Sequence, residues 1–185
     1  MSRFSVLFLI LLSLSVAGRA QDETEKYTLG VGDTLRINVP GLFGAPQDKS
    51  VRRDGTIELS IAGGRLLVAG STADEIAAKV KALAANLGDY RVSVFVLRYA
   101  SHPVAATGSV REPGIKYLTR DAVPVYVFRA VSIPDPAAEG VEIQRADGSS
   151  IACHFDECEK QKVLIRSGDA VRFMANTGVA RSDRR

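Results

Sequence analysis

Few side chains in this sequence have the chemistry that catalysis requires. The two histidines are His102, directly before a proline, and His154, directly after Cys153. There is no Gly-x-Ser-x-Gly elbow, no phosphate-binding loop, no His-x-x-x-His pair and no tryptophan to stack on a sugar ring. Carboxylates such as Glu58 and Asp89 would suit glycoside hydrolysis, but the sequence alone does not place them at a working separation. We therefore expect no catalytic residues and no cofactor.

The two cysteines, Cys153 and Cys158, are separated by only four residues. They follow an N-terminal segment typical of secreted proteins, and thiols oxidise in the compartments that such proteins enter. His154 leaves a zinc site as the alternative, but only three ligands cluster there and their spacing matches no common zinc finger. We expect a disulfide and no metal.

Residues 1–20 have the pattern of a secretory signal peptide. Arg3 precedes an uncharged apolar run over residues 4–18, and the small residue Ala20 suits cleavage directly after it. The run is shorter than the roughly 20 residues of a membrane-spanning helix, although an uncleaved anchor stays an alternative. Cleavage would also remove Arg3 and Arg19 and lower the net charge from +3 by two, which leaves no basis for nucleic-acid binding.

Turn residues organise the sequence that follows. In Gly32-Asp33 the glycine can take a positive φ and the aspartate can bond its own backbone, so the chain can reverse before residues 34–39, which alternate like a half-buried strand. Asp54-Gly55 suits a two-residue hairpin turn. We expect it to pair residues 50–53 with residues 56–59 as two strands in register.

These turns carry a resemblance to a known family. The motif Tyr27-x-Leu-Gly30-x-Gly32-Asp33-x-Leu, followed by Asp54-Gly55-Thr-Ile, resembles the start of polysaccharide biosynthesis/export proteins, the Wza-type outer-membrane exporters. A dinucleotide-binding loop fits less well, because a leucine stands where the third glycine belongs and a strand follows. The resemblance implies an α+β fold, with an export domain of mixed strands and one helix over residues 21–102 and a β-grasp-like domain over residues 103–175.

One helix and one long strand should complete the export domain. Thr72-x-x-Glu75 is a capping box that starts a helix, and Gly88 is placed to end it. Its apolar stripe comprises Ile76, Val80, Leu83 and Leu87. Residues 91–99 are apolar on both faces, so we expect a central strand.

Two shorter segments leave alternatives open. The residues Leu42 and Phe43 lie in a Gly- and Pro-rich loop, where they either fold back on the sheet, which we favour, or form a contact surface. Residues 61–70 are punctuated by glycine and indicate a pair of short strands.

The second domain is expected from a second group of motifs. The phrase Gly108-x-Val-x-x-Pro113-Gly114, whose Pro-Gly pair suits a type II turn, resembles the opening of the soluble-ligand-binding β-grasp domain that follows the export domain in this family. Asp147-Gly148 suits a hairpin, and Gly168-Asp169 repeats the earlier Gly-Asp turn. Residues 123–131 favour a strand by propensity and a helix by resemblance; we expect the helix, with Pro124 in its first turn.

We interpret the turn residues as fold-determining rather than as ligand contacts, because each supplies a fixed or positive φ or an Asx bond. They are Gly30, Gly32, Asp33, Asp54, Gly55, Gly108, Pro113, Gly114, Gly168 and Asp169. The resemblance implies a periplasmic, non-catalytic component of a capsule or exopolysaccharide export channel. Its partners would be further copies in a homo-oligomeric ring, an inner-membrane polysaccharide co-polymerase and the polysaccharide.

The C-terminal residues favour a separate outer-membrane partner. Wza-type relatives cross the outer membrane with a C-terminal helix, but the 12 residues after Phe173 are too few and too charged, and residues 176–185 form a polar tail. We expect a separate porin and at most peripheral association with the outer membrane. A free-standing periplasmic module that binds a glycan or another small ligand is the alternative, and self-association would distinguish the two.

Overall fold

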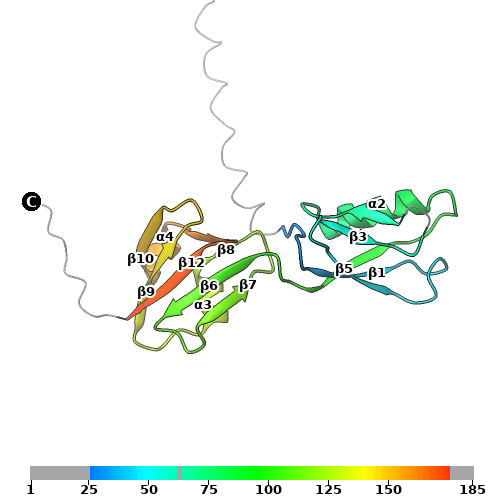
Figure 1. The fold of residues 1–185 in the computed structure, drawn as a ribbon. Helices are drawn as coiled ribbons and strands as arrows, with labels where there is room; N and C mark the ends of the chain where they lie inside the picture. Colours follow the sequence, from blue (N-terminus) through cyan, green and yellow to red (C-terminus); the bar gives the residue numbers. More distant parts are fainter. Residues whose placement is uncertain (1–25, 62–63, 176–185) are drawn as a thin grey trace, which may run out of the picture.

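The computed structural model describes residues 26–61 and 64–175, which fold as two units with separate buried apolar clusters (Figure 1). Mixed strands with a few helices confirm the expected α+β class. The predicted signal peptide and polar tail lie outside the described residues. Within those residues, no helix is both long enough and apolar enough to cross a membrane.

The first unit contains a three-stranded antiparallel sheet, a two-stranded sheet and one helix. The three-stranded sheet has the order β2-β1-β5, and the two-stranded sheet pairs β3 with β4. The elements are β1 (Thr34–Asn38), β2 (Gln47–Ser50), β3 (Thr56–Glu58), β4 (Arg65–Leu67), α2 (Ala73–Ala84) and β5 (Ser93–Arg98).

Strand β1, not β5, is the central strand of the larger sheet. Leu35 and Ile37 of β1 are fully buried, which confirms the predicted alternation. The prediction that residues 91–99 form a central strand is wrong, because β5 pairs with β1 alone among the described strands. Its outward side chains Phe95 and Leu97 are exposed instead of covered.

The Asp54-Gly55 turn forms, but the strands around it pair elsewhere. Gly55 has a φ of 77°, and the Arg52 amide donates to the Thr56 carbonyl at 2.9 Å. Before the turn, β2 pairs with β1, and after it β3 pairs with β4, so the predicted hairpin is wrong. Of the two short strands expected over residues 61–70, the described residues contain one, β4.

Helix α2 begins as predicted and ends earlier than predicted. The Thr72 hydroxyl accepts from the Glu75 amide and the Glu75 carboxylate accepts from the Thr72 amide, which confirms the capping box. Ala85 is the C-cap, so the helix ends before Gly88.

The apolar stripe of this helix is only half as expected. Ile76 and Val80 are buried, but Leu83 is 39% exposed and Leu87 is 55% exposed. A spacing of four residues carries the buried face on to Ala84 instead. In the loop between β1 and β2, Leu42 and Phe43 pack against the core, as we favoured from the sequence.

The second unit is built on a mixed five-stranded sheet with the order β10-β9-β12-β6-β7. Strands β12 and β6 are parallel and the other neighbours are antiparallel. Phe128 and Phe173 stack in its core with ring centroids 6.3 Å apart. Its elements are β6 (Pro103–Gly108), β7 (Gly114–Tyr117), β8 (Ala122–Pro124), α3 (Val125–Ser132), β9 (Ala138–Gln144), β10 (Ser150–His154), α4 (Phe155–Lys160), β11 (Leu164–Arg166) and β12 (Ala170–Ala175).

The helix and the hairpin predicted for the second unit are both present, and the start of the helix differs from the prediction. Residues 125–132 are helical, as we favoured, but Pro124 is the N-cap and not part of the first turn, because its ψ of 152° is extended. Strands β9 and β10 form the predicted hairpin, with Gly148 at a φ of 85°. The Cys153–Cys158 disulfide ties the end of β10 to α4.

Candidate functional site at the junction of the two units

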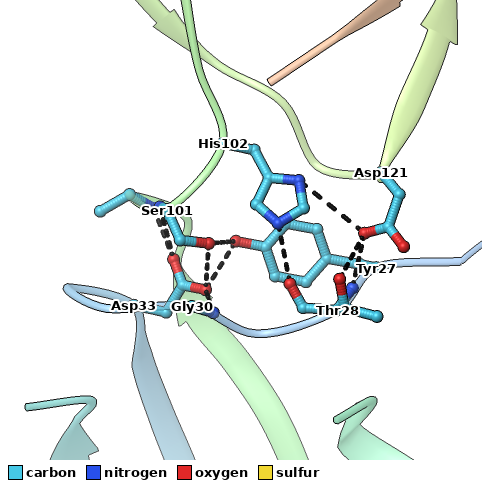
Figure 2. Close-up of polar contacts among 8 residues, drawn as sticks. Tyr27, Thr28, Gly30, Asp33, Ser101, His102 and Asp121 are labelled. Carbon is cyan, nitrogen blue, oxygen red and sulfur yellow. Dashed lines mark hydrogen bonds and ion pairs between the residues drawn. The ribbon is translucent and has the colours of Figure 1, made fainter. Parts of the chain in front are cut away.

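The carboxylate of Asp33 lies at the centre of the polar contacts at the junction (Figure 2). Asp33 has no exposed surface. Five hydrogen bonds converge on its two oxygens. The donors are the Tyr27 hydroxyl (2.7 Å), the Gly30 amide (2.9 Å), the Ala100 amide (2.7 Å), the Ser101 amide (2.9 Å) and the Ser101 hydroxyl (2.8 Å). Since residues 100 and 101 follow β5 and lead into β6, Asp33 binds the chain where it passes between the units.

The residues of the Gly30-x-Gly32-Asp33 motif have distinct roles at this point. Gly32 has a φ of 93°, which reverses the chain directly before the buried carboxylate. Gly30 is needed for space, because a Cβ at this position would lie 2.5 Å from the Cβ of Ser101. The motif therefore forms a turn that receives the linker between the units.

Burial and hydrogen bonding act on the acidic groups of this cluster in different ways. Burial by itself would raise the pKa of the Asp33 carboxyl, but the hydrogen bonds from Gly30, Ala100, Tyr27 and Ser101 outweigh it and hold the pKa below its ordinary value. Burial raises the pKa of the Tyr27 phenol, and the neighbouring Asp33 raises it further. At neutral pH, the phenol is a donor to a charged carboxylate.

A second set of bonds attaches the same N-terminal segment to the second unit. Asp121 accepts from the Thr28 amide (2.7 Å) and the Thr28 hydroxyl (3.0 Å), and its own amide donates to the Lys26 carbonyl (2.8 Å). The Nε2 atom of His102 lies 2.8 Å from the Thr28 carbonyl oxygen, so this nitrogen carries the proton and donates. Residues 26–30 are thus bonded to both units.

The arrangement holds parts together and does not resemble a catalytic triad. The Ser101 hydroxyl donates to the Asp33 carboxylate, and the Nε2 atom of His102 donates to the Thr28 carbonyl, so the serine is not paired with the imidazole as it would be in a triad. The Nδ1 atom of His102 is 3.8 Å from an Asp121 oxygen and has no hydrogen-bond partner within the described part of the chain. In those residues no group of three or more His, Cys, Asp or Glu side chains could hold a metal ion.

A groove of about 510 Å³ lies beside this junction. Its wall contains the end of β5, strand β7 and helix α3, so both units contribute. Leu97, Ile115, Tyr117 and Val131 lie in the groove and are each about half exposed. The lining residues are Leu97, Arg98, Tyr99, Ile115, Lys116, Tyr117, Leu118, Thr119, Val123, Val127, Phe128 and Val131.

The other turn residues singled out in the sequence lie in separate turns and do not gather at the junction. Asp54 accepts from the Thr56 amide and hydroxyl in its own turn. Gly108 has a φ of 81°, and a Cβ there would meet the Phe173 carbonyl oxygen. Asp169 is buried and accepts from the Arg166 amide. Asp147 accepts from the Ser149 amide and hydroxyl in its own turn. Gly114 is the first residue of β7 and pairs with Ala106, so the type II turn predicted at Pro113-Gly114 is wrong.

Sequence reasoning found one half of the junction and missed the other. The motif pointed to Gly30, Gly32 and Asp33, but nothing in the sequence marked Ser101 or Asp121 as their counterparts, 68 and 93 residues from the groups they bind. The position of His102 before a proline between the expected domains was the only local signal.

These features define an α+β protein of two units, joined by a buried hydrogen-bond network and carrying an apolar groove. Residues 21–97 match the family of polysaccharide biosynthesis/export proteins. The comparison with curated proteins finds no match. This match supports a role related to polysaccharide export.

Proposed function

We propose that this protein is a non-catalytic, periplasmic component of a capsule or exopolysaccharide export channel. In this proposal, copies of the chain assemble as a ring that receives polymer from an inner-membrane co-polymerase and passes it to a separate outer-membrane porin. The observation that carries the proposal is the family match over residues 21–97, which includes the motif at the junction.

The topology of the second unit supports the proposal. Numbered within the five-stranded sheet, its strands lie in the order second, first, fifth, third, fourth, and the first and fifth strands, β6 and β12, are parallel. A mixed sheet of this kind is consistent with the β-grasp-like domain that the resemblance implies. An export domain followed by such a domain is the arrangement expected for the family.

The surface also supports a role in assembly. Exposed apolar side chains on β7 and α3 of the second unit give the chain a surface suited to contacts with a neighbouring copy. The junction holds this unit in a fixed position relative to the first unit.

Deletion of the gene tests the proposal directly. We expect the polymer to be synthesised but retained in the cell, and the wild-type gene to restore its appearance outside. Unchanged release of polymer from the deletion strain would refute a role in the channel, and loss of synthesis itself would point to an enzyme.

Fractionation and size measurement test the finer parts. We expect the protein in the soluble periplasmic fraction, or released from membranes by salt or carbonate, and we expect the purified mature protein to self-associate alone or on a partner. Retention in the outer membrane that only detergent reverses, in a strain without a porin partner, would contradict the proposal that a separate porin crosses the outer membrane. A strictly monomeric protein that binds a glycan would favour a free-standing binding module.

A further inference from the structure

The outer face of the first sheet changes from polar to apolar at its edge strand. On this face, Arg36 of β1 forms a two-point ion pair with Asp48 of β2, at 2.7 and 2.8 Å. The residue opposite Arg36 on β5 is Phe95, which is 59% exposed, and Leu97, at the irregularity in the pairing between β5 and β1, is 45% exposed. The apolar surface is therefore confined to β5 and its side of the sheet, where an additional strand would lie.

The backbone of β5 is also available on that side. Strand β5 bonds to β1 along one edge, and no described strand lies along the other. No backbone–backbone hydrogen bond joins the β5 residues to any segment outside the sheet in the part of the chain that the structure describes. The opposite edge, β2, carries the charged residues Asp48 and Lys49, as protected edges do. The two edge strands of this sheet thus differ: β2 is charged, and β5 is apolar.

Hollows at both ends of β5 leave room for a longer segment. The groove beside the junction begins at Leu97 and continues between β7 and α3. A second hollow of about 520 Å³ lies near the start of β5, against α2. Its lining residues are Ala77, Ala78, Lys81, Asp89, Tyr90, Arg91 and Val92. A segment lying along β5, which is about 20 Å long, would extend into both.

Basic residues flank the apolar centre of β5, and the carboxylate of Asp89 in the second hollow is paired with Lys81 at 3.1 Å. The sequence contains no acidic residue between Asp89 and Glu112, whereas Arg91 and Arg98 stand on either side of the apolar centre of β5. Lys116 lines the groove at the far end. A partner with carboxylates is favoured by these cations, and a second copy of β5 is disfavoured because it would bring further arginines to the same edge.

We propose that the free edge of β5 binds an extended, acidic polypeptide segment, which joins the sheet as a fourth strand. Its backbone would pair with Ser93–Arg98, its apolar side chains would cover Phe95 and Leu97, and its carboxylates would meet Arg91 and Arg98. Unpaired backbone groups along β5 suit a peptide better than an acidic glycan, because only a polypeptide backbone can continue the hydrogen-bond ladder of the sheet. The proposal is independent of the role in export.

A pair of synthetic peptides tests the strand-addition step on the full mature chain. The probe is a capped peptide of alternating valine and threonine with aspartates at both ends, and its control carries N-methyl groups on alternate amides. We expect the probe to slow hydrogen exchange of the β5 amides that face away from β1. N-methylation should weaken binding at least about tenfold, because several backbone hydrogen bonds are lost.

Variants test the surface and the charge. Leu97→Lys and Arg91→Glu should each weaken binding of the probe, since both positions are exposed and should tolerate change. Lys49→Glu on the opposite edge is the matched control and should leave binding unchanged. The exchange pattern of β1 reports whether each variant is folded.

Four results would overturn the proposal. They are absence of probe binding at millimolar concentration, equal binding of the N-methylated peptide, protection of β2 in place of β5, and protection of β5 without any peptide in a concentration-dependent dimer. The same protection of β5 by an acidic oligosaccharide would assign the edge to a glycan and would also overturn it. None of these results bears on whether gene deletion blocks polymer release.

Discussion

Replacement of Asp33 by asparagine removes the charge at the centre of the junction with almost no change in shape. One oxygen can still accept from the amides of Ala100 and Ser101. At the position of the other oxygen, the variant has an NH₂ group, which faces the Gly30 amide and the hydroxyls of Tyr27 and Ser101. The hydroxyls can rotate and accept from it, but the Gly30 amide can only donate.

The cost follows from these changes. One donor is left without a partner in a site with no exposed surface, which costs about 1–3 kcal/mol, and the remaining bonds lose the strength that the charge provides. We expect Asp33→Asn to lower the free energy of unfolding of the first unit by about 3 kcal/mol. Asp48→Asn, on the exposed ion pair with Arg36, should cost clearly less, because solvent screens that pair, and it serves as the control.

Hydrogen exchange of the β1 and β5 amides, together with urea denaturation, measures this loss. Exchange reports the first unit separately, which matters because two units need not unfold in one step. A loss below about 1 kcal/mol, or one equal to that of Asp48→Asn, would refute the role assigned to the buried carboxylate.

The effect of Asp33 should also depend on pH. The pKa of Asp33 is lowered in the folded state, so its stabilisation is present above the ordinary aspartate value of about 3.9 and is lost as the pH falls through the folded pKa. The difference in stability between the wild type and Asp33→Asn should therefore be constant near neutrality and narrow below about pH 4. A difference that stays constant down to pH 2 would contradict the lowered pKa.

Three further changes test other parts of the structure. Gly30→Ala should cost about 1–3 kcal/mol by crowding the linker, whereas Gly44→Ala, with no atom within 4 Å of the added Cβ, should cost under about 0.5 kcal/mol in the same urea titration. Ile76→Ala should cost about 2–5 kcal/mol and Leu83→Ala under about 1 kcal/mol; equal losses would contradict the buried face of α2. The Cys153–Cys158 disulfide should make non-reduced protein lighter by two hydrogens in mass spectrometry, and alkylation of both thiols or stoichiometric zinc would disprove it.

Features encoded within a few residues could be predicted from the sequence. The capping box at Thr72 and the positive φ of Gly32 depend on neighbouring residues alone, and both are present. The helix after Pro124 also forms, although its β-branched residues favour a strand, because tertiary packing outweighs so weak a preference.

Features that depend on distant residues could not be predicted in the same way. The Asp54-Gly55 turn was located correctly, but turn chemistry does not say whether the flanking strands find each other or other partners, and here β1 and β4 compete successfully. An apolar face on both sides of β5 suggested a central strand. Apolar residues on both faces also occur in an edge strand such as β5, one face of which is exposed.

The two Gly-Asp turns, at Gly32-Asp33 and Gly168-Asp169, differ in what their aspartates bind, and this difference bears on the groove beside the junction. Each turn buries its aspartate, yet Asp169 accepts bonds from within the second unit, from the Arg166 amide and the Arg145 side chain, whereas Asp33 accepts from the linker. The same local turn thus stabilises the inside of the second unit at Asp169 and holds the two units together at Asp33. Because the groove has one wall from β5 and the others from the second unit, the angle between its walls depends on the linker that Asp33 holds. Loss of that carboxylate should therefore change the angle between the walls and weaken the binding of any ligand that contacts both of them. Every residue that lines the groove would still be present.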